Sequence, residues 1–160
     1  MSGGSIIVIA FLAFVAITIF KGVRIVPQGY KWIVQRLGKY HTTLNPGLNF
    51  VIPYVDEVAY KVTTKDIVLD IPSQEVITRD NAVLLMNAVA YINLTTPEKA
   101  VYGIENYSWA IQNLVQTSLR SIVGEMDLDD ALSSRDHIKA RLKSSISDDI
   151  SDWGITLKTV

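Results

Sequence analysis

The stretch Ile25–Tyr40, IVPQGYKWIVQRLGKY, decides how the rest of the chain is interpreted, because it begins shortly after a long apolar run ends at Phe20. Its aromatic and basic side chains suit two environments, a membrane surface or the first strand of a folded domain that starts near a bilayer. Residues Tyr30–Leu37 alternate between two faces as a strand does, and neither face is polar throughout. The alternation predicts a strand that is covered on both sides, with membrane contact as a second role.

The first twenty residues carry no charged side chain, and Ile6–Phe20 is apolar except for Thr18. As a helix this run rises about 22 Å, and the flanking residues extend it toward the ~30 Å of a bilayer's hydrocarbon core. A buried core helix would keep a polar face, and a cleaved signal peptide would carry positive charge before the apolar run. Here Lys21 and Arg24 follow the run instead. The pattern predicts a retained transmembrane anchor at residues 1–23.

The charges after the anchor predict its orientation. Five basic residues lie within about twenty residues of the helix end, the window in which the positive-inside bias operates: Lys21, Arg24, Lys31, Arg36 and Lys39. No proline interrupts Ile6–Phe20 to mark a hairpin that returns to its starting side. We therefore expect a single-pass membrane protein with its N-terminus outside and the rest cytoplasmic, in the inner membrane if the source is a bacterium.

Composition excludes some classes of function and leaves others open. The net charge of −1 is too balanced to indicate nucleic-acid binding, and the chain has no cysteine for a disulfide or a thiolate zinc site. Basic residues are in excess from Lys21 to Lys65, and acidic residues are in excess after that. This asymmetry has two readings of equal weight, one pole that faces an anionic surface or a chance distribution over solvated surface.

Residues 24–160 show strands first, then helices, then one strand, which predicts an α+β domain of antiparallel strands packed with helices. The first expected elements are a turn at Asn45-Pro46-Gly47, one or two strands from Val58 to Ile71 that Pro72 ends, and a hairpin over 74–94. A helix opened by Thr96-Pro97-Glu98 follows, then a helix over 107–126 and a turn at 127–131. The last elements are a helix that opens with the capping pattern Ser133-x-x-Asp136 and ends at Gly154, and a strand over 155–160. The helical apolar spacing places Leu114, Ile122 and Leu142 in the core.

The residues that could carry chemistry form no convincing set. His41 and His137 are the only histidines, and neither has partners at metal-ligand spacing. No serine lies in a nucleophile-elbow pattern, and the glycines are too far apart to cradle a phosphate. The sequence therefore predicts no catalytic, cofactor-binding or metal residue.

Candidate membrane-contacting residues lie near the anchor. Leu48–Val55 is an apolar patch broken by Pro53, which favours either a loop that faces the core or a second, shallow attachment to the bilayer. Together with the basic and aromatic residues beside the anchor, the patch gives six candidates: Lys21, Arg24, Tyr30, Trp32, Phe50 and Tyr54.

Several long segments in a fixed order resemble one family. The segments are VPQGYKWIVQRLGKY (26–40), NPGLNFVIPYVD (45–56), VLDIPSQEVITRDN (68–81), SLRSIVGEMDLDDALSSRDHI (118–138) and WGI (153–155). Behind an N-terminal anchor they resemble the stomatin and slipin branch of the stomatin–prohibitin–flotillin (SPFH, band 7) superfamily, and bacterial slipins of the QmcA type in particular. The resemblance extends from Val26 to Val160.

The resemblance implies a membrane-anchored, homo-oligomeric scaffold that is not an enzyme and needs no cofactor. Such a protein organises membrane microdomains and associates with the lipid bilayer and with membrane proteases or channels. Family members usually continue into a coiled coil, so we expect this sequence to be a fragment. The proline and acylated cysteines of animal stomatin anchors are absent here, so neither a hairpin nor palmitoylation is expected. The alternative function is a membrane-tethered enzyme or small-ligand-binding domain.

Overall fold

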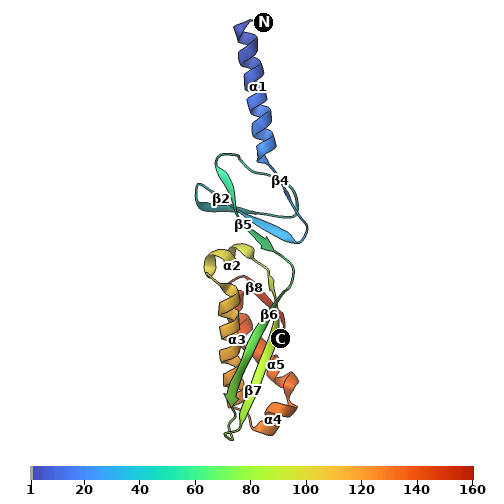
Figure 1. The fold of residues 1–160 in the computed structure, drawn as a ribbon, viewed down its shortest axis with the longest axis vertical. Helices are drawn as coiled ribbons and strands as arrows, with labels where there is room; N and C mark the ends of the chain where they lie inside the picture. Colours follow the sequence, from blue (N-terminus) through green and yellow to red (C-terminus); the bar gives the residue numbers. More distant parts are fainter. Residues whose placement is uncertain (1) are drawn as a thin grey trace. The chain divides into compact units, whose positions relative to one another are not determined.

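The computed structural model describes residues 2–160, and the chain divides between residues 63 and 64 into two compact units (Figure 1). The first unit consists of one helix and five short strands: α1 (Gly3–Gly22), β1 (Val23–Val26), β2 (Tyr30–Arg36), β3 (Lys39–Leu44), β4 (Gly47–Phe50) and β5 (Asp56–Thr63). The second unit contains β6 (Ile67–Ile77), β7 (Val83–Leu94), α2 (Pro97–Gly103), α3 (Tyr107–Gly124), α4 (Leu128–Ser133), α5 (Arg135–Ser151) and β8 (Ile155–Thr159). Strands, helices and a last strand give the α+β fold that the sequence predicts.

The first unit has two small antiparallel sheets, β1–β4 and β3–β2–β5. Their shared core is a cluster of four buried residues, onto which two partly buried side chains pack: Val26, Val34, Leu44 and Val51, with Trp32 and Val58. The predicted strand over Tyr30–Leu37 is confirmed as β2, but it is not the first strand, because Val23–Val26 already forms β1. That short strand is stabilised by its pairing with β4, a distant segment that local alternation cannot reveal.

The second unit is built on the antiparallel sheet β6–β7–β8. The predicted hairpin is confirmed, and its turn is closed by Thr78, whose backbone N–H donates to the Ala82 carbonyl oxygen at 2.9 Å. The prediction that Pro72 ends the preceding strand is wrong. The strand β6 passes through Pro72, and its pairing with β7 shifts register between Ile71 and Gln74. Such a bulge accommodates a residue that has no N–H to donate.

The helices of the second unit begin close to where the sequence predicts. Asn106 caps α3, its side-chain oxygen accepting a hydrogen bond from the Trp109 N–H at 3.1 Å. The predicted capping box at Ser133 is wrong, because the Ser133 hydroxyl donates to the Asp129 carbonyl oxygen at 2.7 Å. Ser134 instead occupies the cap position of α5. The expected turn at 127–131 is largely the short helix α4, which carries Asp129 and Asp130 in its first turn.

The core of the second unit lies where α3 packs against β6 and α5. The predictions for Ile122 and Leu142 are confirmed, since both are buried. The prediction for Leu114 is wrong, because its side chain is only partly buried. The neighbouring Ile111 and Val115 are the buried residues of this part of α3. Leu114 therefore lies at the edge of the helical stripe that meets the sheet.

Gly154 lies between α5 and β8, near the predicted helix end, and α5 itself ends at Ser151. Its backbone φ of +69° is a conformation that other residues rarely adopt. A β-carbon there would also lie 2.5 Å from the Thr96 carbonyl oxygen. Both constraints require glycine at the point where the chain enters β8.

Candidate membrane-contacting site

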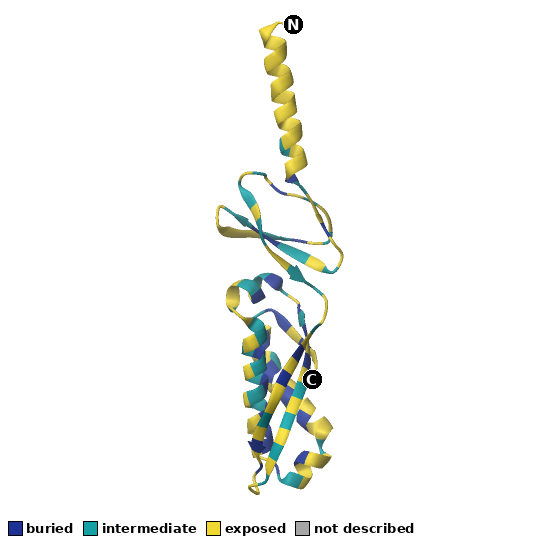
Figure 2. Cartoon of the chain, in the orientation of Figure 1, coloured by how far each residue is buried: buried dark blue, intermediate teal, exposed yellow. Residues whose placement is uncertain are grey.

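Helix α1 is exposed along almost its whole length (Figure 2), and nearly all of its side chains are apolar. Its side chains are exposed or half-exposed over the whole length, and only Gly22 is buried. A buried core helix would have its side chains covered by the rest of the chain, whereas none of this helix's most apolar window is covered. By length and composition α1 is the one candidate membrane span among the described residues. Lys21 in its last turn is favourably placed at the negative end of the helix dipole.

The end of α1 is attached to the loop that follows β4. The Val51 N–H donates a hydrogen bond to the Gly22 carbonyl oxygen at 2.7 Å. A β-carbon at Gly22 would lie 2.6 Å from the Val51 carbonyl oxygen, so only glycine permits this approach. The contact places the apolar patch Leu48–Val55 beside the point where the candidate membrane helix ends.

Strands β1 and β4 form a two-stranded ribbon with one apolar face. In their register Val23 faces Phe50 and Ile25 faces Leu48, so these four residues form one face, here called the ribbon face. Ile25, Leu48 and Phe50 are 70%, 63% and 71% exposed. Exposed aliphatic and aromatic side chains that are contiguous in this way mark an interaction surface.

In the loop after β4, two further side chains of the patch are exposed and one faces the core. Ile52 and Tyr54 are exposed, whereas Val51 is buried in the small core cluster. Tyr54 has a backbone φ of +74°, an uncommon conformation for a residue with a β-carbon. The Lys21 ammonium lies 5.8 Å from the centre of the Tyr54 ring, a cation–π distance. The loop therefore presents Tyr54 outward and beside the helix end.

The remaining candidates lie in the sheet and on β1. Trp32 is half-buried against the core cluster, and the Lys61 ammonium lies 4.5 Å from its ring centre. Tyr30 lies at the start of β2, opposite Thr63 in the register, and is partly exposed. Arg24 is exposed on β1 and, with Trp32 and Lys61, lines a pocket of about 690 Å³. The structure thus brings Lys21 beside Tyr54, and Arg24 beside Trp32.

Some surface residues were missed by the sequence reasoning. Ile25, Leu48 and Ile52 share the exposed apolar surface with Phe50, and Lys61 faces Trp32. Ile25 was available from the sequence as an apolar residue directly after Arg24. Its significance depends on the pairing with Leu48, which only the fold provides.

A partly buried ion pair joins the end of β2 to the start of β5. The Arg36 guanidinium donates from Nε to Asp56 at 2.7 Å and from a terminal nitrogen to the second carboxylate oxygen at 3.2 Å. The Asp56 side chain is only 3% exposed and also accepts a hydrogen bond from the Ile52 N–H. The hydrogen bonds from Arg36 lower the pKa of Asp56 to about 2, and burial opposes the shift.

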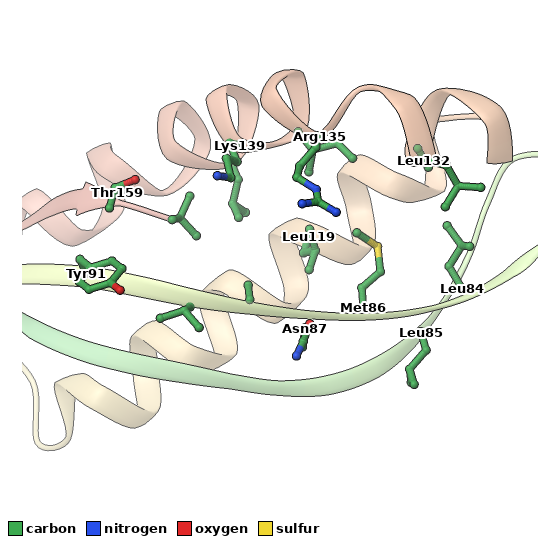
Figure 3. Close-up of a pocket in the computed structure, with 16 residues that line it drawn as sticks. Leu84, Leu85, Met86, Asn87, Tyr91, Leu119, Leu132, Arg135, Lys139 and Thr159 are labelled. Atoms are coloured by element: carbon green, nitrogen blue, oxygen red, sulfur yellow. The ribbon is translucent and has the colours of Figure 1, made fainter.

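The second unit contains a pocket of about 640 Å³ between β7 and helices α4 and α5 (Figure 3). Its walls are mainly aliphatic, and Arg135 and Lys139 extend toward it from α5. The lining residues include no aspartate, glutamate, histidine or serine. Across residues 2–160 no three potential metal ligands of the His, Cys, Asp or Glu types come together, and His41 and His137 are both exposed. This pocket offers cations and apolar surface but no acid–base pair.

Comparison with known proteins identifies the class of the chain. The SPFH domain / Band 7 family matches residues 24–160. Human mitochondrial stomatin-like protein 2 is 38% identical over 130 residues, which cover 81% of this chain and 36% of the human protein. An uncharacterised protein of Methanocaldococcus jannaschii is 41% identical over 142 residues, 89% of this chain and 71% of its own length. An uncharacterised protein of Mycobacterium tuberculosis is 35% identical over 161 aligned positions, 98% of this chain and 42% of its own length. The chain spans little more than a third of the human relative.

Proposed function

The chain belongs to the SPFH domain / Band 7 family, in its stomatin and slipin branch, and we propose that it is an oligomeric scaffold anchored in a membrane by α1. Its stomatin-like relatives suggest a membrane-associated scaffold role, and this family is generally non-enzymatic. The finer role proposed here is to organise a membrane microdomain and to hold membrane proteins such as proteases or channels in it. No catalytic activity is assigned to the chain.

The observation that carries this proposal is the continuity of apolar surface from α1 to the ribbon face. A helix with exposed apolar side chains on every side needs an apolar environment, such as lipid or a protein core, to cover them. The attachment of Val51 to Gly22 keeps Phe50 and Tyr54 close to the end of that helix. We propose that α1 spans the bilayer and that these two aromatic residues enter the headgroup region, with Lys21, Arg24, Tyr30 and Trp32 as further contacts.

We propose the arrangement in the membrane from the charge distribution. Residues 1–23 form the anchor with the N-terminus outside, and residues 24–160 form the SPFH domain in the cytoplasm, because basic residues flank only the C-terminal end of α1. A reporter that is active only in the cytoplasm, fused after Val160, should be active. Activity of a periplasmic reporter at that position would reverse the proposed orientation.

Self-association is supported by a second exposed surface. SPFH proteins are membrane-associated and oligomeric as a family. On the β6–β7 hairpin, the sheet face away from the helices is rich in exposed apolar side chains: Val68, Ile77, Val83, Leu85, Val89 and Tyr91. We propose that this hairpin face packs against a second copy of the chain, which would remove its apolar surface from water.

The size of the complete protein in mild detergent tests the scaffold function. We expect a large assembly by light scattering, and we expect Leu85→Asp to shift it to smaller species by placing charge in the interface. Thr117→Asp, at an exposed position of α3, is the matched control and should leave the size unchanged. A wild-type protein that runs as a monomer would overturn the scaffold proposal.

The alternative of a membrane-tethered enzyme or small-ligand-binding domain has one observation in its favour, the 640 Å³ pocket beside α5. The same size measurement discriminates between the two, since a ligand-binding domain does not need to assemble. The alternative would be supported if the wild type were monomeric and bound a small anion that has an apolar body, with Arg135 and Lys139 facing the negative charge.

A further inference from the structure

The loop between β4 and β5 is closed at its base by Asp56. The Asp56 N–H donates to the Ile52 carbonyl oxygen at 2.9 Å, and the Ile52 N–H donates to the Asp56 carboxylate at 3.0 Å. These two hydrogen bonds join the ends of a turn over 52–56, and Tyr54 lies in the middle of it. The carboxylate therefore supplies the acceptor that a backbone carbonyl would supply to the Ile52 N–H in regular structure.

Tyr54 has a backbone conformation that is unfavourable for a residue with a side chain. Its φ of +74° lies in the left-handed region, which disfavours a residue with a β-carbon by roughly five- to thirtyfold in population. The ring is 70% exposed, so burial against the chain does little to offset this cost. The closed turn, together with the cation–π contact from Lys21, is what holds the ring outward.

The Asp56 carboxylate is itself held by Arg36. One carboxylate oxygen accepts a hydrogen bond from Arg36 Nε at 2.7 Å, and the other accepts from a terminal Arg36 nitrogen at 3.2 Å and from the Ile52 N–H. An asparagine amide in this place would turn its NH2 group toward at least one of these donors, whichever way it is oriented. Only a carboxylate can therefore accept from Arg36 and close the turn at the same time.

Phe50, the other aromatic residue proposed to enter the headgroup region, is held in a different way. It lies on β4, opposite Val23 in the register of the β1–β4 ribbon. It is 71% exposed, about as much as Tyr54, and the hydrogen bonds of the Asp56 carboxylate do not reach its strand. Strand pairing positions Phe50, whereas the closed turn positions Tyr54.

We propose that Asp56 is the positioning residue for the membrane contact of Tyr54, and that Arg36 orients its carboxylate for this role. The carboxylate closes the turn, and the closed turn holds Tyr54 in the left-handed conformation that directs the ring outward. Without the carboxylate the turn opens, Tyr54 relaxes to an ordinary φ, and the ring leaves the headgroup region. The inference rests on the proposed membrane contact of Tyr54, and it adds the device that controls it.

The test uses the full chain in vesicles of phosphatidylcholine and phosphatidylglycerol, with a nitroxide spin label as the probe. The chain has no cysteine, so Tyr54→Cys and Phe50→Cys each create a single labelling site, and these two labelled chains are the parents. Electron paramagnetic resonance measures the mobility of the label and its collisions with oxygen dissolved in the lipid. In both parents we expect the label to collide with this oxygen. Adding Asp56→Asn should raise the mobility at position 54 and remove most of its collisions, and should change neither property at position 50.

Two further variants separate positioning from a general loss of stability. Arg36→Gln should change the label at position 54 in the same direction as Asp56→Asn, because the carboxylate loses the partner that orients it. Ile33→Val is the matched control, since Ile33 is buried in the same sheet and lies outside the core cluster that contains Val51. It should lower the unfolding midpoint slightly and leave both labels as they are in the parents.

The outcomes distinguish this inference from the proposed function. If Asp56→Asn leaves the label at position 54 unchanged, Asp56 does not position the loop and the inference fails. If the labels at positions 50 and 54 change together, Asp56 has only a structural role in the first unit, and the inference also fails. If neither parent label collides with oxygen in the lipid, the proposed membrane contact fails, and the mobility at position 54 still shows whether Asp56 closes the turn.

Discussion

Helices α1 and α5 have similar lengths and bury their apolar side chains in opposite ways. Helix α1, of 20 residues, is apolar on every side, and its large side chains are exposed. Helix α5, of 17 residues, is mostly polar, and it buries all four of its large aliphatic residues: Ile138, Leu142, Ile146 and Ile150. These four recur every fourth residue and form one stripe against the rest of the second unit.

The contrast shows that apolar content alone does not tell whether a helix belongs to a protein core. In α5 the spacing of a few side chains matches the surface that covers them, so the helix is stable in water. In α1 the described chain offers nothing to cover the helix, and the missing cover must come from lipid or another chain. The ribbon face and the loop with Tyr54 continue this second kind of surface beyond the helix end.

One substitution made in both helices tests this contrast, and it should have the largest effect. Ile146 is 0% exposed, so Ile146→Asp places an unpaired charge in the core and should lower the free energy of unfolding by about 4 kcal/mol. Ile9 is 55% exposed, so Ile9→Asp should leave the unfolding midpoint unchanged in detergent. In a bilayer Ile9→Asp should instead disfavour insertion by about 2.5–3.5 kcal/mol.

Circular dichroism during heating measures the first effect, and membrane fractionation measures the second. Ser144→Asp, on the exposed side of α5, is the control for adding a carboxylate to that helix. If Ile146→Asp and Ser144→Asp unfold at the same temperature, the assigned buried stripe is wrong. If Ile9→Asp is retained in membranes as well as the wild type, α1 is not the anchor.

The second prediction asks whether the ribbon face and the loop with Tyr54 contact lipid, as α1 is proposed to do. In a chain of residues 22–160, Phe50→Ser and Tyr54→Ser should each weaken binding to anionic liposomes by up to ~1.5–3 kcal/mol, the transfer free energy of a buried aromatic side chain. Flotation of the vesicles measures the binding. Leu37→Ser removes an exposed apolar side chain from the β2–β3 turn of the same unit and should have no effect.

Circular dichroism of the same samples establishes that each variant is folded. Equal flotation of the folded wild type, Phe50→Ser and Tyr54→Ser would assign these side chains to a role other than membrane contact. A loss for Leu37→Ser as large as for Phe50→Ser would indicate that any exposed apolar residue attaches the unit. The ribbon face would then have no special part in binding.

The elements that sequence could predict are those specified by local composition and spacing. Helix α1 follows from its lack of charge, α5 from its four-residue apolar repeat, and the β6–β7 hairpin from a polar turn between two strand patterns. Four of the six proposed membrane contacts could be named from sequence because they follow the anchor closely, and Phe50 and Tyr54 because they lie in an apolar patch broken by Pro53. Their grouping into Lys21 with Tyr54, and Arg24 with Trp32, required the fold.

The elements that sequence missed depend on contacts between distant segments. Strand β1 is too short to show a period, and its pairing with β4 makes it a strand. In β7 almost every residue is apolar, so alternation could not show that Ala90 and Ile92 face the helices while Leu85 and Val89 face away. The same limit explains Leu114, since a helical stripe is broader than the surface that finally covers it.

The third prediction concerns the ion pair Arg36–Asp56 in the first unit. Its folded-state pKa of about 2 lies below the ordinary value of 3.8 for Asp56, so the charged pair stabilises the unit fully above about pH 4. This contribution is lost as pH falls from about 4 to about 2. The neighbouring His41 lowers the same pKa to a smaller extent.

Trp32 fluorescence can follow the acid unfolding of this unit in a chain that carries Trp109→Phe and Trp153→Phe. Asp56→Asn should remove the acid-dependent part of the stability and lower the midpoint of thermal unfolding at pH 7. An acid profile that is the same with and without Asp56→Asn would show that other carboxylates determine it.

The last prediction sets the exposed ion pair Arg79–Asp127 of the second unit against that partly buried pair. The geometry is as good, with hydrogen bonds of 3.1 and 2.7 Å between the guanidinium and the carboxylate. However, the Arg79 and Asp127 side chains are 64% and 42% exposed, so water and salt screen the pair. Asp127 is also the N-cap residue of α4, but its side chain accepts no hydrogen bond from the backbone of that helix.

We therefore expect Asp127→Asn to change the unfolding midpoint of the second unit far less than Asp56→Asn changes that of the first. Raising the salt concentration should abolish the small Asp127 effect and leave most of the Asp56 effect. If the two substitutions prove equally costly at high salt, burial is not what distinguishes the two pairs, and bidentate geometry alone would have to account for both.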